Sequence, residues 1–432
     1  MLRGLLVLFV YILISAYGFG MPHLFALAYI WTDLFRPQGV AQAIISGLPL
    51  SMIFGVAAIG AWFFCKDKPR RVTFGTGVMI VWTIWMTIST YNAVVQDAAW
   101  AKWDWAFKSA VFAVLLPYYF NTREQIESAL LMVLIPIGAN IIAVGIKTLM
   151  GGGGYGMDMA VSGNGISESS TLAMVATSVI PLFLWVRNYS LLVSPAWLRQ
   201  VMALSLVALA LVAALGTFAR TGLVSVALLL VIGFFRTRRK IAYVCVVLFL
   251  LSGVSGFMGD AWTERMGTLQ TAGSEASAMG RVAAWLWTLD YVKEHPFGGG
   301  FNVYFINYFS LPMTDGTILE VKGKAFHSIY FEVLGELGIP GLVMFLSMIG
   351  WSITTLLSIR RFAKRHAELG WMGDMATGLV CSTFIYMLGG AFVGVAFQPY
   401  FWYLFGIGIS LKHYADRLRK QPEYAPTKTG FE

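Results

Sequence analysis

The sequence predicts an all-α, polytopic integral membrane protein with about twelve transmembrane helices. The chain has 432 residues, of which 58% are hydrophobic and only 12% charged, about half the charge of a typical soluble domain. Apolar runs of about 20 residues, the length that crosses a bilayer, recur along the chain. These runs are continuous rather than alternating, so they favour helices over the strands of a membrane barrel.

The apolar runs define the expected spans in chain order. The first run, 4–34, is interrupted by Gly18, Gly20 and Pro22, so it predicts either one kinked span or two short ones. Counted once, it is followed by eleven further runs, at 42–64, 73–93, 103–120, 124–148, 167–187, 198–217, 221–235, 240–258, 326–358, 373–394 and 398–412. Residues 94–102 are expected to form a short loop, and 259–325 a long one between spans nine and ten.

Lysine and arginine set the expected orientation. Four clusters fall on one side of the predicted spans: Lys66 to Arg71, Arg236 to Lys240, Arg360 to Arg365, and the tail from Lys412 to Lys428. Cationic loops favour the cytoplasm. The 259–325 loop is then extracytoplasmic, and both termini are cytoplasmic.

The net charge, the cysteines and the N-terminal run exclude several other classes of protein. The net charge of +9 lies in short loops between spans, as membrane topology predicts, and it does not indicate nucleic-acid binding. Cys65, Cys245 and Cys381 lack paired spacing, so no disulfide framework or metal site is expected. The N-terminal run continues to Trp31 without a convincing cleavage site, and we interpret it as a retained span.

Three regions are expected along the chain. Residues 1–165 would hold the N-terminal transmembrane helices, 166–412 the catalytic core, and 413–432 a cytoplasmic tail. Residues 276–292 read as a helix, with Val282, Trp285 and Leu286 on one face at helical spacing. Such a helix could lie on the membrane surface.

Two arginines on the outer side are candidates for binding an anion. Arg220 lies between two apolar runs, where it either caps a helix end or holds a phosphate bidentately. Arg281 lies in the first turns of the 276–292 helix, where backbone N–H groups also attract anions. It could equally be a solvated surface arginine. Gly298 to Gly300 follow and would allow close backbone approach to a ligand.

His327 is the candidate base, because histidine transfers protons near neutral pH. It opens span ten, and Tyr330, Glu332 and Glu336 follow on the next turns. A polar residue that only starts the helix is the simpler interpretation. Lys108, one turn inside the outer end of its span, would either contact substrate or extend its ammonium to the interface.

The sequence lacks the motifs of several other chemistries. It has no Asp-x-Asp pair to hold a metal on a sugar diphosphate, no Walker A run and no recognisable Ser/His/Asp set. The expected chemistry therefore uses no ATP, metal or other cofactor.

Taken together, these motifs resemble the core of the O-antigen ligase and O-antigen polymerase superfamily over about residues 165–410. The resemblance rests on the order of Phe218 to Gly222, Gly280-Arg281, Pro296 with Gly298 to Gly300, and His327 followed by Tyr330, Glu332, Glu336 and Gly338. The N-terminal third is more similar to the O-glycosylation ligase branch. Many members carry Asn after the histidine, whereas this chain has Ser328.

The resemblance implies an inner-membrane glycosyltransferase with a periplasmic active site. As an O-antigen ligase, it would transfer a glycan from undecaprenyl diphosphate to a hydroxyl of lipid A–core, with inversion, in lipopolysaccharide synthesis. His327, Arg220 and Arg281 would be catalytic, and Arg220, Arg281, Lys108, Tyr330 and Glu332 would bind substrate.

Two other functions fit the sequence. An O-antigen polymerase or a protein O-oligosaccharyltransferase would share the donor and differ in the acceptor. A transporter of lipid-linked sugars belongs to a different class. Against a transporter, the spans carry no central carboxylate relay, and no inverted repeat is evident.

Overall fold

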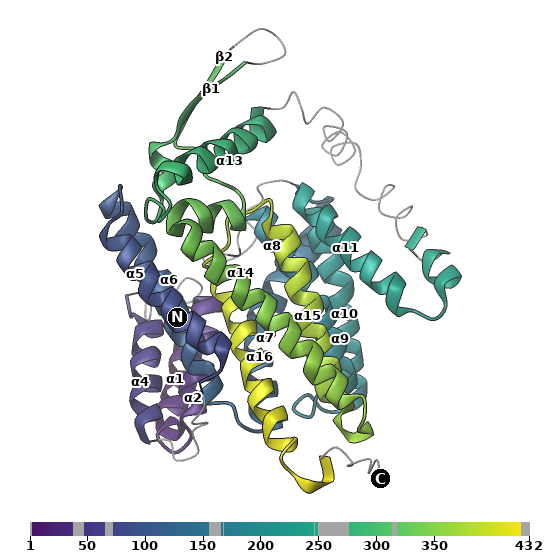
Figure 1. Cartoon of the computed structure of the whole chain (residues 1–432). Coiled ribbons are helices and arrows are strands. Elements are labelled where there is room, and N and C mark those ends of the chain that lie inside the picture. The colour runs from purple at the N-terminus through teal and green to yellow at the C-terminus, as the bar shows by residue number, and fades with distance from the viewer. Residues whose placement is uncertain are drawn as a thin grey trace, which may run out of the picture.

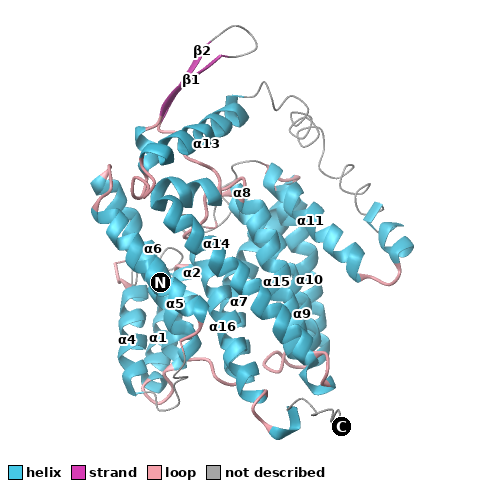
Figure 2. Cartoon of the chain, viewed as in Figure 1, coloured by secondary structure: helices cyan, strands magenta, loops and turns pink. Residues whose placement is uncertain are grey.

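The computed structural model describes residues 2–37, 47–64, 72–154, 166, 168–245, 247–248, 276–312 and 318–424. Within this part, the chain folds into a bundle of α-helices with one two-stranded hairpin (Figures 1 and 2). The longer elements are α1 (Leu2–Gly18), α2 (His23–Phe35), α4 (Leu50–Phe64), α5 (Phe74–Tyr91), α6 (Gln96–Leu115), α7 (Arg123–Gly151), α8 (Ser169–Ser178), α9 (Ile180–Tyr189), α10 (Ala196–Gly216), α11 (Arg220–Arg236), α13 (Ala276–Glu294), β1 (Tyr308–Pro312), β2 (Ile318–Lys322), α14 (Ile329–Ala363), α15 (Gly370–Gly390) and α16 (Pro399–Leu418).

The bundle has the character of a membrane protein. Four stretches in the described part are long and apolar enough to cross a membrane: Arg123–Gly151, Ser169–Tyr189, Ala196–Gly216 and Ile329–Ala363. Large apolar side chains also point outward from several helices, as Phe9, Val56 and Val201 do. A soluble monomer rarely exposes so much apolar surface. The all-α membrane class is confirmed, and the count of twelve spans stays a prediction.

Two sequence expectations can be compared directly with the helices. The run 4–34 forms two helices, because the segment between Gly18 and Pro22 ends α1 before α2 starts at His23. The loop expected at 94–102 is wrong, since α6 begins at Gln96. Its first turns carry charged residues, which made them read as a loop. Residues 249–258 of the predicted 240–258 span, residues 259–275 and 313–317 of the long loop, and the tail from 425 lie outside the described residues.

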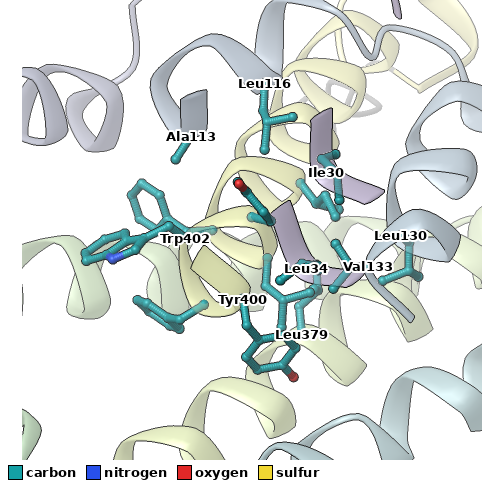
Figure 3. Packing of buried hydrophobic residues seen from close by; sticks show 14 of the residues in the cluster. Ile30, Leu34, Ala113, Leu116, Leu130, Val133, Leu379, Tyr400 and Trp402 are labelled. Carbon is teal, nitrogen blue, oxygen red and sulfur yellow. The ribbon is translucent and has the colours of Figure 1, made fainter. Parts of the chain in front are cut away.

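The core is formed where five other segments pack against α16. Figure 3 shows apolar side chains from α2, α6, the turn after it, α7, α15 and α16 packed together: Ile30, Leu34, Ala113, Leu116, Leu130, Val133, Leu379, Tyr400 and Trp402. The buried Tyr400 hydroxyl is satisfied by Ser178 and Ser382, 2.8 and 3.0 Å away. This core fixes α16 against the helices that border the site.

Helix α14 is kinked at Gly338, whose φ of 69° lies in the left-handed region. Pro340 follows and cannot donate to the carbonyl four residues earlier, that of Glu336. Other groups satisfy the carbonyls freed there. The Ser89 hydroxyl and the Gly300 N–H donate to the backbone carbonyl of Glu336, and the Trp85 indole N–H donates to the carbonyl of Leu337, 2.8 Å away. The kink thus ties α14 to α5 and to the glycine segment after α13.

Helix α13 and the β1–β2 hairpin lie at one end of the bundle, and the C-terminal end of α16 lies at the other (Figure 1). The hairpin pairs antiparallel with Tyr308 opposite Lys322, and no strands were expected there. The predicted helix at 276–292 is confirmed as α13. Val282 and Leu286 are exposed on it, whereas Trp285 instead turns toward α14 and stacks on Phe331.

Candidate functional site

A cavity of about 550 Å³ lies at the α13 end of the bundle. It has the size of a small-molecule site. Helix α6, the segment after α13, the start of α14 and the turn before α16 border it. The lining residues are Ala98, Ala101, Lys102, Trp105, Glu168, Asn302, Tyr304, Phe305, Ala325, Phe326, His327, Glu332, Glu336, Gly394 and Gln398.

One wall of the cavity carries a lysine between two carboxylates. Lys102 of α6 donates to Glu332 Oε1 at 2.7 Å and to both oxygens of Glu336 at 2.9 Å. The two glutamates are four residues apart, so they share a face of α14. We call these three residues the acidic wall, because two carboxyl groups share one cation. Breaking such a buried pair typically costs about 3–5 kcal/mol, so Lys102 fixes both carboxylates.

Backbone N–H groups complete the acidic wall. Ala396 donates to Glu332 Oε2 at 2.9 Å, and Asn302 donates to Glu336 Oε1 at 3.0 Å. Asn302 lies directly after the glycine segment that binds the α14 kink. The kink therefore positions the donor for Glu336 as well as the helix that carries it.

His327 also lines the cavity, in the segment that leads into α14. Its φ of 45° is unusual for a non-glycine residue. Two contacts hold this conformation. Trp285 Nε1 donates to the Phe326 carbonyl at 2.7 Å, and Asn307 bonds both backbone groups of Lys324 at 2.8 Å. Helix α13 and the hairpin thereby fix the histidine.

Burial, followed by the positive charges of Arg281 and Lys324, lowers the pKa of His327 to about 4. Burial and Arg281 also lower the pKa of Lys324. The imidazole is therefore neutral at physiological pH. Among the described residues, no hydrogen bond to its ring is present. A neutral, unengaged imidazole can accept a proton from a group in the cavity.

Arg281 and Lys324 form a cationic pair next to His327. Arg281 lies in the first turns of α13, and its Nε is buried without a hydrogen-bond partner in the described part of the chain. Gly280 leaves room for the lysine, since a Cβ there would lie 3.4 Å from Lys324 Cε. Two cations held close together suit a polyanionic ligand.

Arg220 is the first residue of α11 and is half-buried. The first turn of α11 lies against α8, where a Cβ on Gly222 would come within 3.0 Å of Ala173. Glu168, the cap of α8, lines the cavity. Arg220 thus starts a helix packed against α8, and it is not among the residues that line the cavity.

Two predicted substrate-binding residues lie apart from this group. Lys108 pairs with Asp104 at 2.7 Å and lines a different cavity, between α2, α4 and α6. Tyr330 donates its hydroxyl to the Met387 carbonyl at 3.0 Å. Of the predicted residues, the structure brings His327 and Glu332 into one cavity with Arg281 beside it.

The glycine segment also differs from expectation. A Cβ on Gly298 would lie 2.5 Å from the Gly338 nitrogen, and one on Gly300 would lie 2.2 Å from Ala93 Cβ. Both glycines have positive φ. The close approach predicted from the sequence is thus made to the protein's own α14 and α5 rather than to a ligand.

Sequence reasoning missed Lys102 and Lys324. Lys102 has a signal in hindsight, because Glu332 and Glu336 share a face of an apolar helix, and buried carboxylates require a cation. Lys324 has a weaker signal, a cation three residues before the candidate base. Neither spacing identifies which lysine of the chain is the partner.

Two family models match consecutive parts of the chain. Residues 2–191 match a family of unknown function, and residues 204–346 match the family described as O-antigen ligase. A comparison with curated proteins gives no match. The second region contains Arg220, Arg281 and His327, so the resemblance found from the motifs is confirmed. The family implies a glycosyltransferase-like membrane enzyme that acts on lipid-linked glycans.

Proposed function

We propose, on the premise that residues 204–346 carry the core of the O-antigen ligase and polymerase superfamily, that this protein is an O-antigen ligase. It transfers a glycan from undecaprenyl diphosphate to a hydroxyl of lipid A–core. The observation that supports this most is the position of His327. It lines the cavity, and the charges of Arg281 and Lys324 act on its ring.

The reaction follows from this arrangement. The acceptor hydroxyl enters the cavity and gives its proton to the neutral imidazole of His327 as its oxygen attacks the anomeric carbon. The new C–O bond forms on the face of the anomeric carbon opposite the diphosphate. The bond between that carbon and the diphosphate oxygen breaks, and the diphosphate leaves with the electron pair. Displacement from the opposite face inverts the anomeric centre.

The cations stabilise the leaving group. Arg281 and Lys324 lie where the diphosphate gains charge, and Arg220 reaches it from the α8 side. Fixed cations aimed at developing charge are the largest single contribution in many enzymes. With these side chains in place, the proposed transfer proceeds without a metal ion or ATP.

The acidic wall favours the same orientation of the donor. A diphosphate placed against Glu332 and Glu336 would be repelled, whereas the Arg281–Lys324 side attracts it. The donor diphosphate therefore binds outside the acidic wall, and its sugar faces His327. The acceptor approaches from within the cavity.

The site is proposed to face the periplasm of the inner membrane. The Lys and Arg clusters predict this orientation, and α13 and the hairpin lie at the end of the bundle away from the C-terminal end of α16. In a variant without native cysteines, Ser310→Cys on β1 should react with a membrane-impermeant thiol reagent in spheroplasts. Gln421→Cys, beyond α16, should not, and the reverse pattern would contradict the orientation.

Transfer by the purified protein tests the function. The donor is an undecaprenyl-diphosphate-linked glycan, supplied in separate reactions with lipid A–core, with a second lipid-linked glycan and with a serine-containing pilin peptide. Ligase activity predicts product only with lipid A–core. Product only with the second glycan would identify a polymerase, and product only with peptide a protein O-oligosaccharyltransferase. No transfer to any acceptor, with donor moved across vesicle membranes, would indicate a transporter.

A further inference from the structure

We propose that the acidic wall is the binding site for the acceptor sugar and that it selects an uncharged sugar over an acidic one. This inference rests on the proposed transfer reaction and concerns what the same cavity recognises. It assigns a role to Lys102, Glu332 and Glu336 that neither the donor diphosphate nor the base requires.

The first argument is charge. Lys102 neutralises one of the two carboxylates, and Glu168 adds a further negative charge to the lining. His327 is neutral, so the groups that line the cavity sum to a net negative charge. A uronic acid or phosphorylated sugar would place another anion within a few ångströms of these carboxylates. At the effective dielectric of a protein surface, such repulsion lowers the binding affinity by more than about tenfold.

The second argument is hydrogen-bonding capacity. A carboxylate offers about four acceptor sites. Glu332 uses Oε1 for Lys102 and Oε2 for the Ala396 N–H, so acceptor capacity remains on both oxygens. Sugar hydroxyls are donors that match it. Lys102 acts as a positioning residue, because its contact with Oε1 holds Glu332 in the orientation that accepts those hydrogen bonds.

The third argument is space above the carboxylate. Gly394 lines the cavity, and a Cβ there would lie 3.4 Å from Glu332 Oε2. The absence of a side chain leaves this oxygen open to a ligand. Trp105, Tyr304 and Phe305 add aromatic surface to the same cavity, against which the apolar face of a sugar ring can pack.

The fourth argument is the order of groups. His327 lines the cavity, whereas Arg281 and Lys324, whose charges act on its ring, are not among the lining residues. A hydroxyl that gives the imidazole a proton therefore comes from the cavity side. The donor diphosphate is held on the other side by charge. The sugar that binds against the acidic wall therefore belongs to the acceptor and not to the donor.

The test compares two acceptors that differ in one group, a terminal hexose and the corresponding hexuronic acid on the same lipid. Acceptor kcat/KM and donor affinity are measured for the wild type, Glu332→Gln and Gly394→Ala. Glu294→Gln, on the exposed end of α13, is the matched control. The wild type should prefer the hexose by about tenfold or more.

Glu332→Gln should reduce this preference and raise the KM for the hexose acceptor, with donor affinity unchanged. Gly394→Ala adds only a methyl group at a contact distance that the fold tolerates, and it should also raise acceptor KM alone. An unchanged hexose-to-uronate ratio in Glu332→Gln, or an unchanged acceptor KM in Gly394→Ala, would refute the acceptor site. Absence of transfer by the wild type to either acceptor would refute the proposed function itself.

Discussion

The indole N–H of Trp285 on α13 donates to the carbonyl of Phe326, 2.7 Å away, and Phe326 is the residue directly before His327. The side chain of Phe326 is buried, so its carbonyl has little access to water. The surface helix thus holds the backbone that positions the candidate base. This contact links α13, far from α14 in sequence, to the proposed proton transfer.

Trp285→Phe should lower kcat more than it changes donor affinity. The phenyl ring can still stack on Phe331, but the Phe326 carbonyl loses its donor, which costs about 1–3 kcal/mol. Thermal stability in detergent should fall with kcat. Trp287→Phe is the control, because Trp287 stacks on Tyr291 rather than bonding Phe326. Equal effects of the two changes would show that the hydrogen bond does not position His327.

The pH dependence of the transfer rate should reveal two pKa values for His327, one in the free enzyme and one with donor bound. Burial, Arg281 and Lys324 lower its pKa to about 4 in the free enzyme. The imidazole is then neutral above that pH, and kcat/KM, which reports the free enzyme, should fall only near pH 4. A bound diphosphate offsets the two cations and raises the pKa. The acid limb of kcat should therefore lie at higher pH than that of kcat/KM.

Lys324→Met gives the matched test of this electrostatic account. Removing the cation should raise the pKa of His327 and move the acid limb of kcat/KM upward. Lys322→Met, on the exposed strand β2, should leave the limb in place. A limb near the ordinary histidine value of about 6.5 in the wild type would contradict the account.

Gly338→Ala should destabilise the protein strongly. Gly338 has a φ of 69°, and a Cβ there would lie 2.3 Å from the Phe297 carbonyl carbon and 2.4 Å from the Pro296 oxygen. Gly350→Ala in the same helix meets nothing within 4 Å and should be neutral or stabilising by about 0.5–1 kcal/mol. Melting temperatures in detergent measure both. Similar melting temperatures would mean that the kink does not organise the site.

The sequence predicted the parts of the fold that depend on continuous apolar runs. The helix at 276–292 and the helix that follows His327 were found because their apolar spacing is regular. The start of α6 was missed because its charged turn resembles a loop, although Lys102 there faces a buried pair of glutamates. The hairpin and the α14 kink depend on contacts between distant segments, which spacing alone does not encode.

The candidate site was also predicted only in part. His327, Glu332 and Arg281 were identified because they follow one another around the long loop in an order that a known family shares. Lys102 lies 230 residues before its partner Glu332, so only the fold shows the pair. Lys108 was chosen instead because a lysine within an apolar helix is unusual, yet it pairs locally with Asp104.

Chelation should leave transfer intact. The sequence has no Asp-x-Asp pair, and the proposed role of a metal ion on the diphosphate is filled by Arg281, Lys324 and Arg220. Initial rates are compared in excess chelator and after Mg²⁺ is restored. A loss of rate that Mg²⁺ reverses would show that the arginines have a different role.

The central claim is that His327 acts on the acceptor and Arg281 on the donor diphosphate. It is tested most directly by measuring donor affinity and single-turnover rate for His327→Ala and Arg281→Ala. His327→Ala should bind donor normally and react more slowly by about two to four decades. Arg281→Ala should lose about 1.5–3 kcal/mol of donor binding as well as rate. If His327→Ala binds donor as weakly as Arg281→Ala and its bound donor reacts at the wild-type rate, His327 is a binding residue and the account is wrong.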